Sequence, residues 1–170
     1  MADEDNRVIR LKGAETEREF MITARAAQLS ELVRNSLDDD DSDSDPVIDL
    51  LGRVSTDTLA KIVEFMNHYD EERMNDIPTP LPGISFNEIV EQEWYNNFMV
   101  DMDRDMLFDV LTASNYMGIK PLLDLACLKV TFELTGRSAD EIRDILNLPE
   151  LSPEEEANAR IEHRWLFETS

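Results

Sequence analysis

The segment from Pro121 to Leu134 constrains the fold more than any other part of this sequence, because apolar residues surround it almost completely when it is drawn as a helix. One face is predicted to carry Leu122, Leu123, Ala126, Cys127, Val130 and Leu134, and the opposite face Leu125, Leu128 and Phe132. A helix that is apolar nearly all round must be covered on both sides. One cover is the protein core, and the other is either the C-terminal segments or a second polypeptide.

The charge balance restricts the partners of this chain. Among 170 residues, 38 are acidic and 16 are basic, which gives a formal net charge of −22 at pH 7. Affinity for nucleic acids and for anionic membranes depends largely on Lys and Arg, so this charge predicts that the chain binds neither nucleic acid nor a membrane. The N-terminus is polar and acidic, and no apolar run approaches the roughly 18 residues of a membrane span. We therefore expect a cytoplasmic and nuclear protein.

Few residues in the sequence could carry catalysis. His68 and His163 are the only histidines, lie far apart in the chain and are predicted to be ordinary surface residues. Cys127 is the only cysteine, and its place on an apolar face predicts a buried structural thiol rather than a nucleophile. The sequence has no GxGxxG motif, no P-loop and no EF-hand ligand spacing. These features indicate a protein that is not an enzyme and that needs no cofactor or metal ion.

The N-terminal half alternates short strands with helices. Three short apolar runs are predicted to be strands, the first two forming a hairpin, at residues 8–11, 19–22 and 47–50. Thr23 is expected to cap one helix that continues to Leu37. The run DDDDSDSD at 38–45 predicts a solvated loop, because its charges repel one another and nothing in it can be buried. A second helix is predicted over residues 59–69.

Proline and glycine divide the rest of the chain. Pro78, Pro80, Pro82 and Gly83 predict a long loop from Asp70 to about Glu88, although the aromatic residues around its end are too apolar to remain in solvent. Four helical segments are then predicted, at residues 106–117, 120–134, 139–147 and 153–167. The last two begin with the N-terminal signatures SADE and SPEE, the second of which places a proline at the first helical position.

Several motifs in the C-terminal two-fifths resemble those of the Skp adaptor family of Skp/cullin/F-box (SCF) ubiquitin ligases. The sequence ASNYMGIKPLLDLAC at 113–127 is similar to the family signature AANYLDIKGLLDxxC, and GRSADEIR at 136–143 is similar to GKTPEEIR. PEEE at 153–156 and Trp165 resemble the family's ending. Features further upstream follow in the same order, so that the similarity spans about residues 8–168.

The resemblance implies an α/β fold of the BTB/POZ type, in which a small three-stranded sheet is packed with helices and followed by a C-terminal helical extension. The BTB/POZ-like domain is expected at residues 7–134, with an acidic loop at 38–45 and a variable loop at 70–93. The F-box-binding helices are expected at residues 135–170.

The same resemblance implies a non-catalytic adaptor that links F-box proteins to a cullin in ubiquitin-dependent protein degradation. Asn115 and Tyr116 match the family's cullin-facing pair, and the helical wheel adds Phe108 to them. The F-box side is matched by Leu123, Cys127, Val130, Leu134, Ile161 and Trp165. The second apolar face and the terminal tryptophan are therefore interpreted as partner surface. When no partner is bound, a weak homodimer through the F-box-binding surface is compatible with this interpretation.

The chain departs from the family pattern at several positions. Residues 79–100 are apolar and proline-containing where family members usually have a charged loop, which predicts an ordered insertion or an extra contact surface. Met117–Gly118 replaces Leu-Asp, and Leu166–Phe167 replaces a polar tail. Pro153 resembles a proline that some protist members hydroxylate and glycosylate, although the sequence by itself favours the plainer explanation that it occupies the first helical position.

Two alternative functions stay open on the sequence alone. A Skp-like BTB module in a kinetochore or vesicular-ATPase assembly would show the same motifs without membership of a ligase. An acidic chaperone of basic clients such as histones would account for the net charge, but for none of the motifs.

Overall fold

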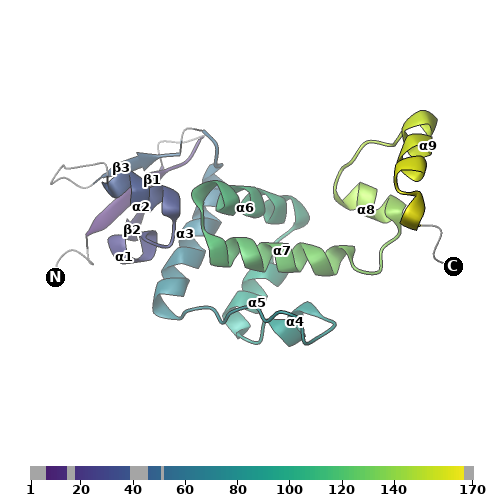
Figure 1. The fold of residues 1–170 in the computed structure, drawn as a ribbon. Helices are drawn as coiled ribbons and strands as arrows, with labels where there is room; N and C mark the ends of the chain where they lie inside the picture. The colour runs from purple at the N-terminus through teal and green to yellow at the C-terminus, as the bar shows by residue number, and fades with distance from the viewer. Residues whose placement is uncertain (1–6, 15–17, 39–45, 51, 167–170) are drawn as a thin grey trace. The chain divides into compact units, whose positions relative to one another are not determined.

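The computed structural model describes residues 7–14, 18–38, 46–50 and 52–166. A three-stranded sheet occupies the N-terminal end of this part of the chain (Figure 1). The central strand β1 (Val8–Lys12) pairs antiparallel with β2 (Glu19–Thr23) and parallel with β3 (Val47–Asp49). Residues alternate along each strand between the core and solvent, as expected for a sheet that is covered on one face. The three predicted strands and the hairpin are confirmed.

The helix predicted to continue to Leu37 is wrong, because the structure divides it into α1 (Ala24–Ala27) and α2 (Glu31–Asp38). Ser30 is fully buried at the break. Its hydroxyl donates a hydrogen bond to the carbonyl of Met117 at 2.7 Å and accepts one from the amide of Val33 at 3.2 Å. Both bonds favour a new helix start over continuation of α1, since a serine cap satisfies a backbone amide that the helix leaves unpaired. The predicted cap at Thr23 is confirmed.

The long helix α3 (Thr56–Glu71) packs against β2, α1 and α6 (Arg104–Met117), so that it lies at the centre of the core. Ser55 caps α3 by accepting a hydrogen bond from the amide of Thr58 at 3.1 Å. Leu59, Ile62 and Phe65 are fully buried. The periodicity of the sequence therefore predicted this helix correctly.

The loop predicted from Asp70 to about Glu88 is shorter in the structure, because α3 continues to Glu71 and a helix that the sequence did not predict, α4 (Phe86–Ile89), begins before Glu88. A second helix that was not predicted, α5 (Glu93–Val100), begins where the variable loop at 70–93 was expected to end. Tyr95 and Phe98 are buried beside Phe65, with ring centroids 5.6 Å and 5.8 Å from that ring. The ring of Trp94 stacks on His68 at a centroid distance of 3.8 Å. The prediction that His68 is an ordinary surface residue is therefore wrong, because α5 half-buries its ring.

The remaining helices follow the predicted segments. They are α7 (Lys120–Leu134), α8 (Ala139–Ile145), α9 (Pro153–Glu162) and the short 3₁₀ helix η1 (Arg164–Leu166). The last predicted segment is interrupted at His163, which ends α9. Capping boxes begin α8 at Ser138 and α9 at Ser152, as the sequence predicted.

The chain forms two compact units, the first ending at Phe132 and the second beginning at Glu133. The hydrophobic core belongs entirely to the first unit. Neither α8 nor α9 contains a buried residue. Of the acidic run at 38–45 that was predicted to be a loop, Asp38 is instead the last residue of α2, and residues 39–45 lie outside the described part of the chain. Within the described part, no helix combines the length and the apolar character that a membrane crossing requires.

Candidate partner-binding surfaces

A groove of about 420 Å³ lies between α2 and the C-terminal end of α6. It is lined by Glu31, Leu32, Asn35, Ser36, Asn115, Tyr116 and Gly118. Asn115 is exposed and Tyr116 is half-buried, and the guanidinium of Arg53 lies 5.4 Å from the centre of the Tyr116 ring. A cation at this distance attracts the ring and restricts its position. We call this surface the α2–α6 groove, and it brings together the two residues that match the family's cullin-facing pair.

Two residues hold α2 against the end of α6 and so shape this groove. Gly118 ends α6 in the left-handed conformation at φ 67°. A Cβ atom at Gly118 would lie 2.8 Å from the Cβ of Glu31, which is closer than side chains normally approach. The hydroxyl of Ser30 bonds the carbonyl of Met117 directly before that turn. Where the family has Leu-Asp, this chain therefore has the buried side chain of Met117 and a tight turn at Gly118, which lines the groove.

Phe108 lies two turns before Asn115 on α6 and is half-buried, but it does not line the α2–α6 groove. Its role at the partner surface stays a prediction. The sequence missed the groove residues of α2, among them Leu32 and Asn35. The hydrophobic pattern placed Leu32 on the inner face of a helix, and nothing in the sequence showed that this helix adjoins the end of α6.

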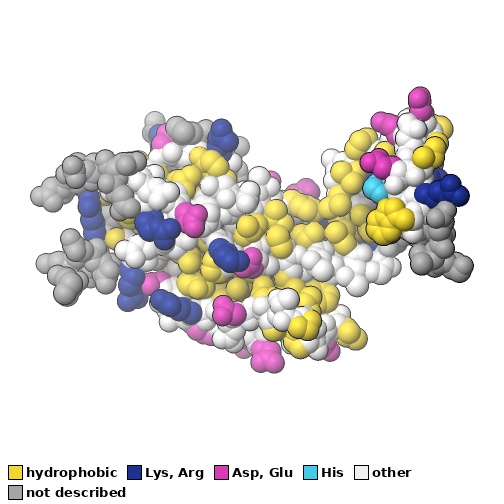
Figure 2. Space-filling model, viewed as in Figure 1, with side chains coloured by type: hydrophobic (Ala, Val, Ile, Leu, Met, Phe, Trp, Pro, Cys, Tyr) yellow, Lys and Arg dark blue, Asp and Glu magenta, His cyan; other side chains and the backbone are white. Residues whose placement is uncertain are grey.

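On α7, the four residues matched to the F-box side follow one side of the helix that is only partly covered. Leu123, Val130 and Leu134 are half-buried and Cys127 is exposed, and we call these four residues the α7 stripe. Figure 2 shows a run of hydrophobic side chains over α7. The predicted division of the helix into two faces needs a correction, because Leu122 and Ala126 are buried in the core rather than placed with the stripe. The core covers a wider arc of the helix than the wheel assigned to it.

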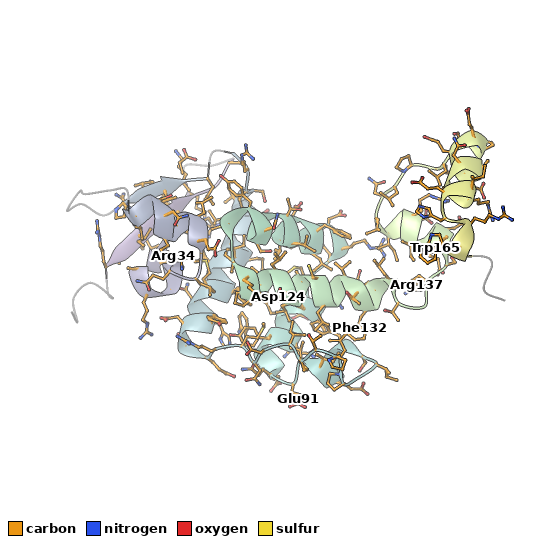
Figure 3. All side chains as sticks on the ribbon, viewed as in Figure 1. Arg34, Glu91, Asp124, Phe132, Arg137 and Trp165 are labelled. Atoms are coloured by element: carbon orange, nitrogen blue, oxygen red, sulfur yellow. The ribbon has the colours of Figure 1, made fainter. Side chains whose placement is uncertain are left out.

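The opposite side of α7 packs against the rest of the first unit. The ring of Phe132 meets that of Phe86 from α4 edge to face, with centroids 6.5 Å apart, and Figure 3 shows Phe132 between the two helices. The ammonium group of Lys129 lies 5.5 Å from the centre of the Phe86 ring. Helix α4 therefore packs on this side, where Leu125 and Leu128 are buried, so this side is the one of the two predicted faces that the core covers.

Cys127 is exposed, so the prediction of a buried thiol is wrong. Desolvation by the atoms around the sulfur raises the pKa of the Cys127 thiol, and the nearby charge of Asp124 raises it further. A raised pKa leaves the thiol protonated at neutral pH and makes it a poor nucleophile. Among the residues that the structure describes, no three His, Cys, Asp or Glu side chains are grouped so that they could hold a metal ion.

The second unit exposes large apolar side chains of its own. Ile161 on α9 is 74% exposed, and Trp165 on η1 is 67% exposed (Figure 3). Leu148 and Leu151, in the loop before α9, are each more than half exposed. Pro153 is exposed at the beginning of α9, which agrees with its expected helical position. Exposed apolar groups in such number indicate a surface that another polypeptide covers.

The small sheet packed with helices, the α7 stripe and the exposed helical C-terminus define an α/β protein of the BTB/POZ-like class with apolar surface left uncovered. Residues 120–166 match the family model described as Skp1 family, dimerisation domain. The chain is 32% identical over 151 residues to the S-phase kinase-associated protein 1 homolog of Tetrahymena thermophila. These aligned residues cover 88% of each of the two chains. This protein belongs to the Skp1 family.

Two further relatives agree with this assignment. Suppressor of kinetochore protein 1 of Schizosaccharomyces pombe is 34% identical over 149 residues, covering 86% of this chain and 90% of the relative. The E3 ubiquitin ligase complex SCF subunit sconC of Emericella nidulans is 34% identical over 140 residues, covering 82% of this chain and 84% of the relative. The resemblance stated from the sequence motifs is therefore confirmed.

Proposed function

We propose that this chain is a non-catalytic adaptor of an SCF-type ubiquitin ligase, where it links F-box substrate receptors to a cullin in the cytoplasm and nucleus. The observation that carries the proposal is the partly exposed α7 stripe of a Skp1-family chain whose C-terminal unit also exposes Ile161 and Trp165. The Emericella relative is named as an SCF subunit. An acidic chaperone is supported by net charge alone, and a kinetochore or vesicular-ATPase module has no structural feature that favours it.

The α7 stripe has the geometry of a receptor for an apolar helix. Its members recur at intervals of three and four residues, so that they follow one side of α7. Apolar helices bind to grooves and faces of this spacing through side chains of the same periodicity. Trp165 supplies the type of residue that contributes most to interface affinity. We assign the F-box receptor to this stripe together with the helices of residues 135–170, and the BTB/POZ-like domain to residues 7–134.

The α2–α6 groove is the proposed cullin site, with Asn115 and Tyr116 as its principal contacts and Phe108 as a neighbouring one. The groove and the α7 stripe share no residue, so that one chain can bind both partners at the same time. An adaptor of this kind contributes by positioning, because it holds the receptor's substrate near the enzyme that transfers ubiquitin. The acidic surface keeps a protein with exposed apolar stripes in solution.

Two variants test the proposal with purified partners. Trp165→Ala should weaken binding of an F-box protein by about 2 kcal/mol or more, as measured by isothermal titration calorimetry. The double variant Asn115→Lys, Tyr116→Lys should lose cullin binding and keep F-box binding. Wild-type F-box affinity in Trp165→Ala, or parallel loss of both partners in the folded double variant, would contradict the proposed sites.

A further inference from the structure

A second groove, of about 430 Å³, runs along the flank of α7 beside the stripe. Ile77 and Thr79 of the variable region line one side, while Cys127 and Thr131 are among the α7 residues that line the other. We call it the α7 groove. Cys127 belongs both to this groove and to the α7 stripe, so the two surfaces are continuous.

The chain leads from Thr79 at the α7 groove to Phe86, which packs on Phe132 further along the same helix. This segment exposes two large apolar side chains, Leu81 at 41% and Ile84 at 91%. We call residues 77–84 the insertion loop. From residue 79 onward it belongs to the proline-containing stretch in which this sequence departs from the family pattern.

Hydrogen bonds to Glu88 of α4 hold the end of the insertion loop in place. One carboxylate oxygen of Glu88 accepts from the amide of Ile84 at 2.8 Å and from the amide of Ser85 at 3.2 Å. Glu88 also lies directly against Gly83, where a Cβ atom would approach its side chain to 2.8 Å. Because α4 also packs on α7, the backbone that carries Ile84 is fixed, although the Ile84 side chain itself is exposed. A pre-organised apolar side chain loses little conformational entropy when a partner covers it.

We propose that the insertion loop extends the receptor-binding surface, so that the F-box receptor on the α7 stripe also inserts an uncharged apolar side chain into the α7 groove and packs against Leu81 and Ile84. This inference rests on the proposed function, since it names more of the surface that the same partner covers. The continuity through Cys127 favours the receptor over any other occupant, because a polypeptide lying on the stripe reaches the groove without leaving α7.

The charges in the α7 groove support an uncharged occupant. The ammonium of Lys120 and the carboxylate of Asp124 both line the groove and pair with each other at 2.6 Å. Their pairing leaves little net charge to attract an ionised side chain. The rest of the lining is apolar or carries a hydroxyl or thiol, which suits an aliphatic or aromatic group.

The test compares three variants for binding to one purified full-length F-box protein by calorimetry. The double variant Leu81→Ala, Ile84→Ala should raise the dissociation constant about tenfold, since two apolar side chains lose their contact with the receptor. Met21→Ala is the matched control, because Met21 is 72% exposed on the outer face of the sheet, and it should leave the affinity unchanged. Trp165→Ala reports on the proposed function itself. All variants should retain wild-type cullin binding and wild-type unfolding midpoints.

The outcomes separate the two proposals. If the double variant binds the F-box protein as tightly as wild type while Trp165→Ala loses affinity, the role of the insertion loop is wrong and the adaptor function stands. If the wild-type protein does not bind the F-box protein at all, the adaptor function is wrong, and the role of the insertion loop that rests on it is wrong as well. If the double variant changes only self-association, measured by sedimentation velocity, a second copy of this chain is the occupant and the receptor assignment is overturned.

Discussion

Single residues determine how the segments that form the α2–α6 groove meet. Ser30 directly precedes α2 and joins it to the end of α6, because its buried hydroxyl bonds both the carbonyl of Met117 and the amide of Val33. Gly118 allows α6 to turn directly beside Glu31. Both residues are small and were unremarkable in the sequence pattern. The side chains of Asn115 and Tyr116 depend on them for their position beside α2.

Replacing Gly118 by alanine should destabilise the protein by more than the cost of placing alanine in a left-handed conformation. A left-handed conformation costs a non-glycine residue about 1 kcal/mol, and the added Cβ atom would also lie 2.8 Å from that of Glu31. We expect a decrease of about 2 kcal/mol in the free energy of unfolding, measured by urea denaturation. Gly52→Ala is the control, because Gly52 has φ 71° but no atom within 4 Å of the added Cβ. Equal losses in the two variants would show that the close approach to Glu31 has no energetic effect.

At the scale of elements, the C-terminal helices depend on their caps because they have no buried residue. Each begins with a serine whose hydroxyl and backbone amide both bond a glutamate three positions later. The hydroxyl and amide of Ser152 hold the pKa of Glu155 below its ordinary value of 4.5. The amide and hydroxyl of Ser138 lower the pKa of Glu141 in the same way. These bonds favour the charged carboxylate, so the caps are strongest when both glutamates are ionised.

The pH dependence of α9 follows from this shift. Because the pKa of Glu155 is lower in the folded chain than in the unfolded one, its stabilising effect is complete above about pH 4.5 and is lost as the pH falls through the lowered pKa. Ser152→Ala removes one donor and should raise the pKa of Glu155 toward 4.5, as observed in an NMR titration of the side-chain carboxyl. Ser138→Ala should shift the titration of Glu141 and leave that of Glu155 unchanged. An unshifted Glu155 in Ser152→Ala would contradict the capping box.

At the scale of the whole molecule, stability is distributed unevenly between the two units. The core is formed by residues up to Leu128, and α8 and α9 bury nothing of their own. Helices of 7 and 10 residues are marginal in water without tertiary packing. A partner that covers Ile161 and Trp165 would therefore supply the packing that the second unit lacks.

Hydrogen–deuterium exchange should reveal this difference directly. The amides of α8 and α9 should exchange at least about tenfold faster than those of α3, because local opening of the second unit exposes no core. Addition of a purified F-box protein should slow exchange in α8, α9 and the C-terminal half of α7. Exchange in α8 and α9 that is as slow as in α3 before any partner is added would show that the second unit is stable by itself.

The sequence by itself determined the features that are encoded within one segment. Strand alternation, helical periodicity and capping residues predicted the three strands, α3, α6 and α7, and the starts of α8 and α9, and the linear motifs identified the family. The positions matched to partners, such as Asn115 and Trp165, came from those motifs.

Only the tertiary structure decided which surfaces of these segments stay uncovered. It showed that α4 covers Phe132, that Cys127 is exposed, that His68 stacks on Trp94, and that α2 completes the groove beside Tyr116. Each of these facts joins residues far apart in the chain. The physical reason is that the periodicity of a segment records which of its faces are apolar, whereas burial depends on which distant segment packs against each face.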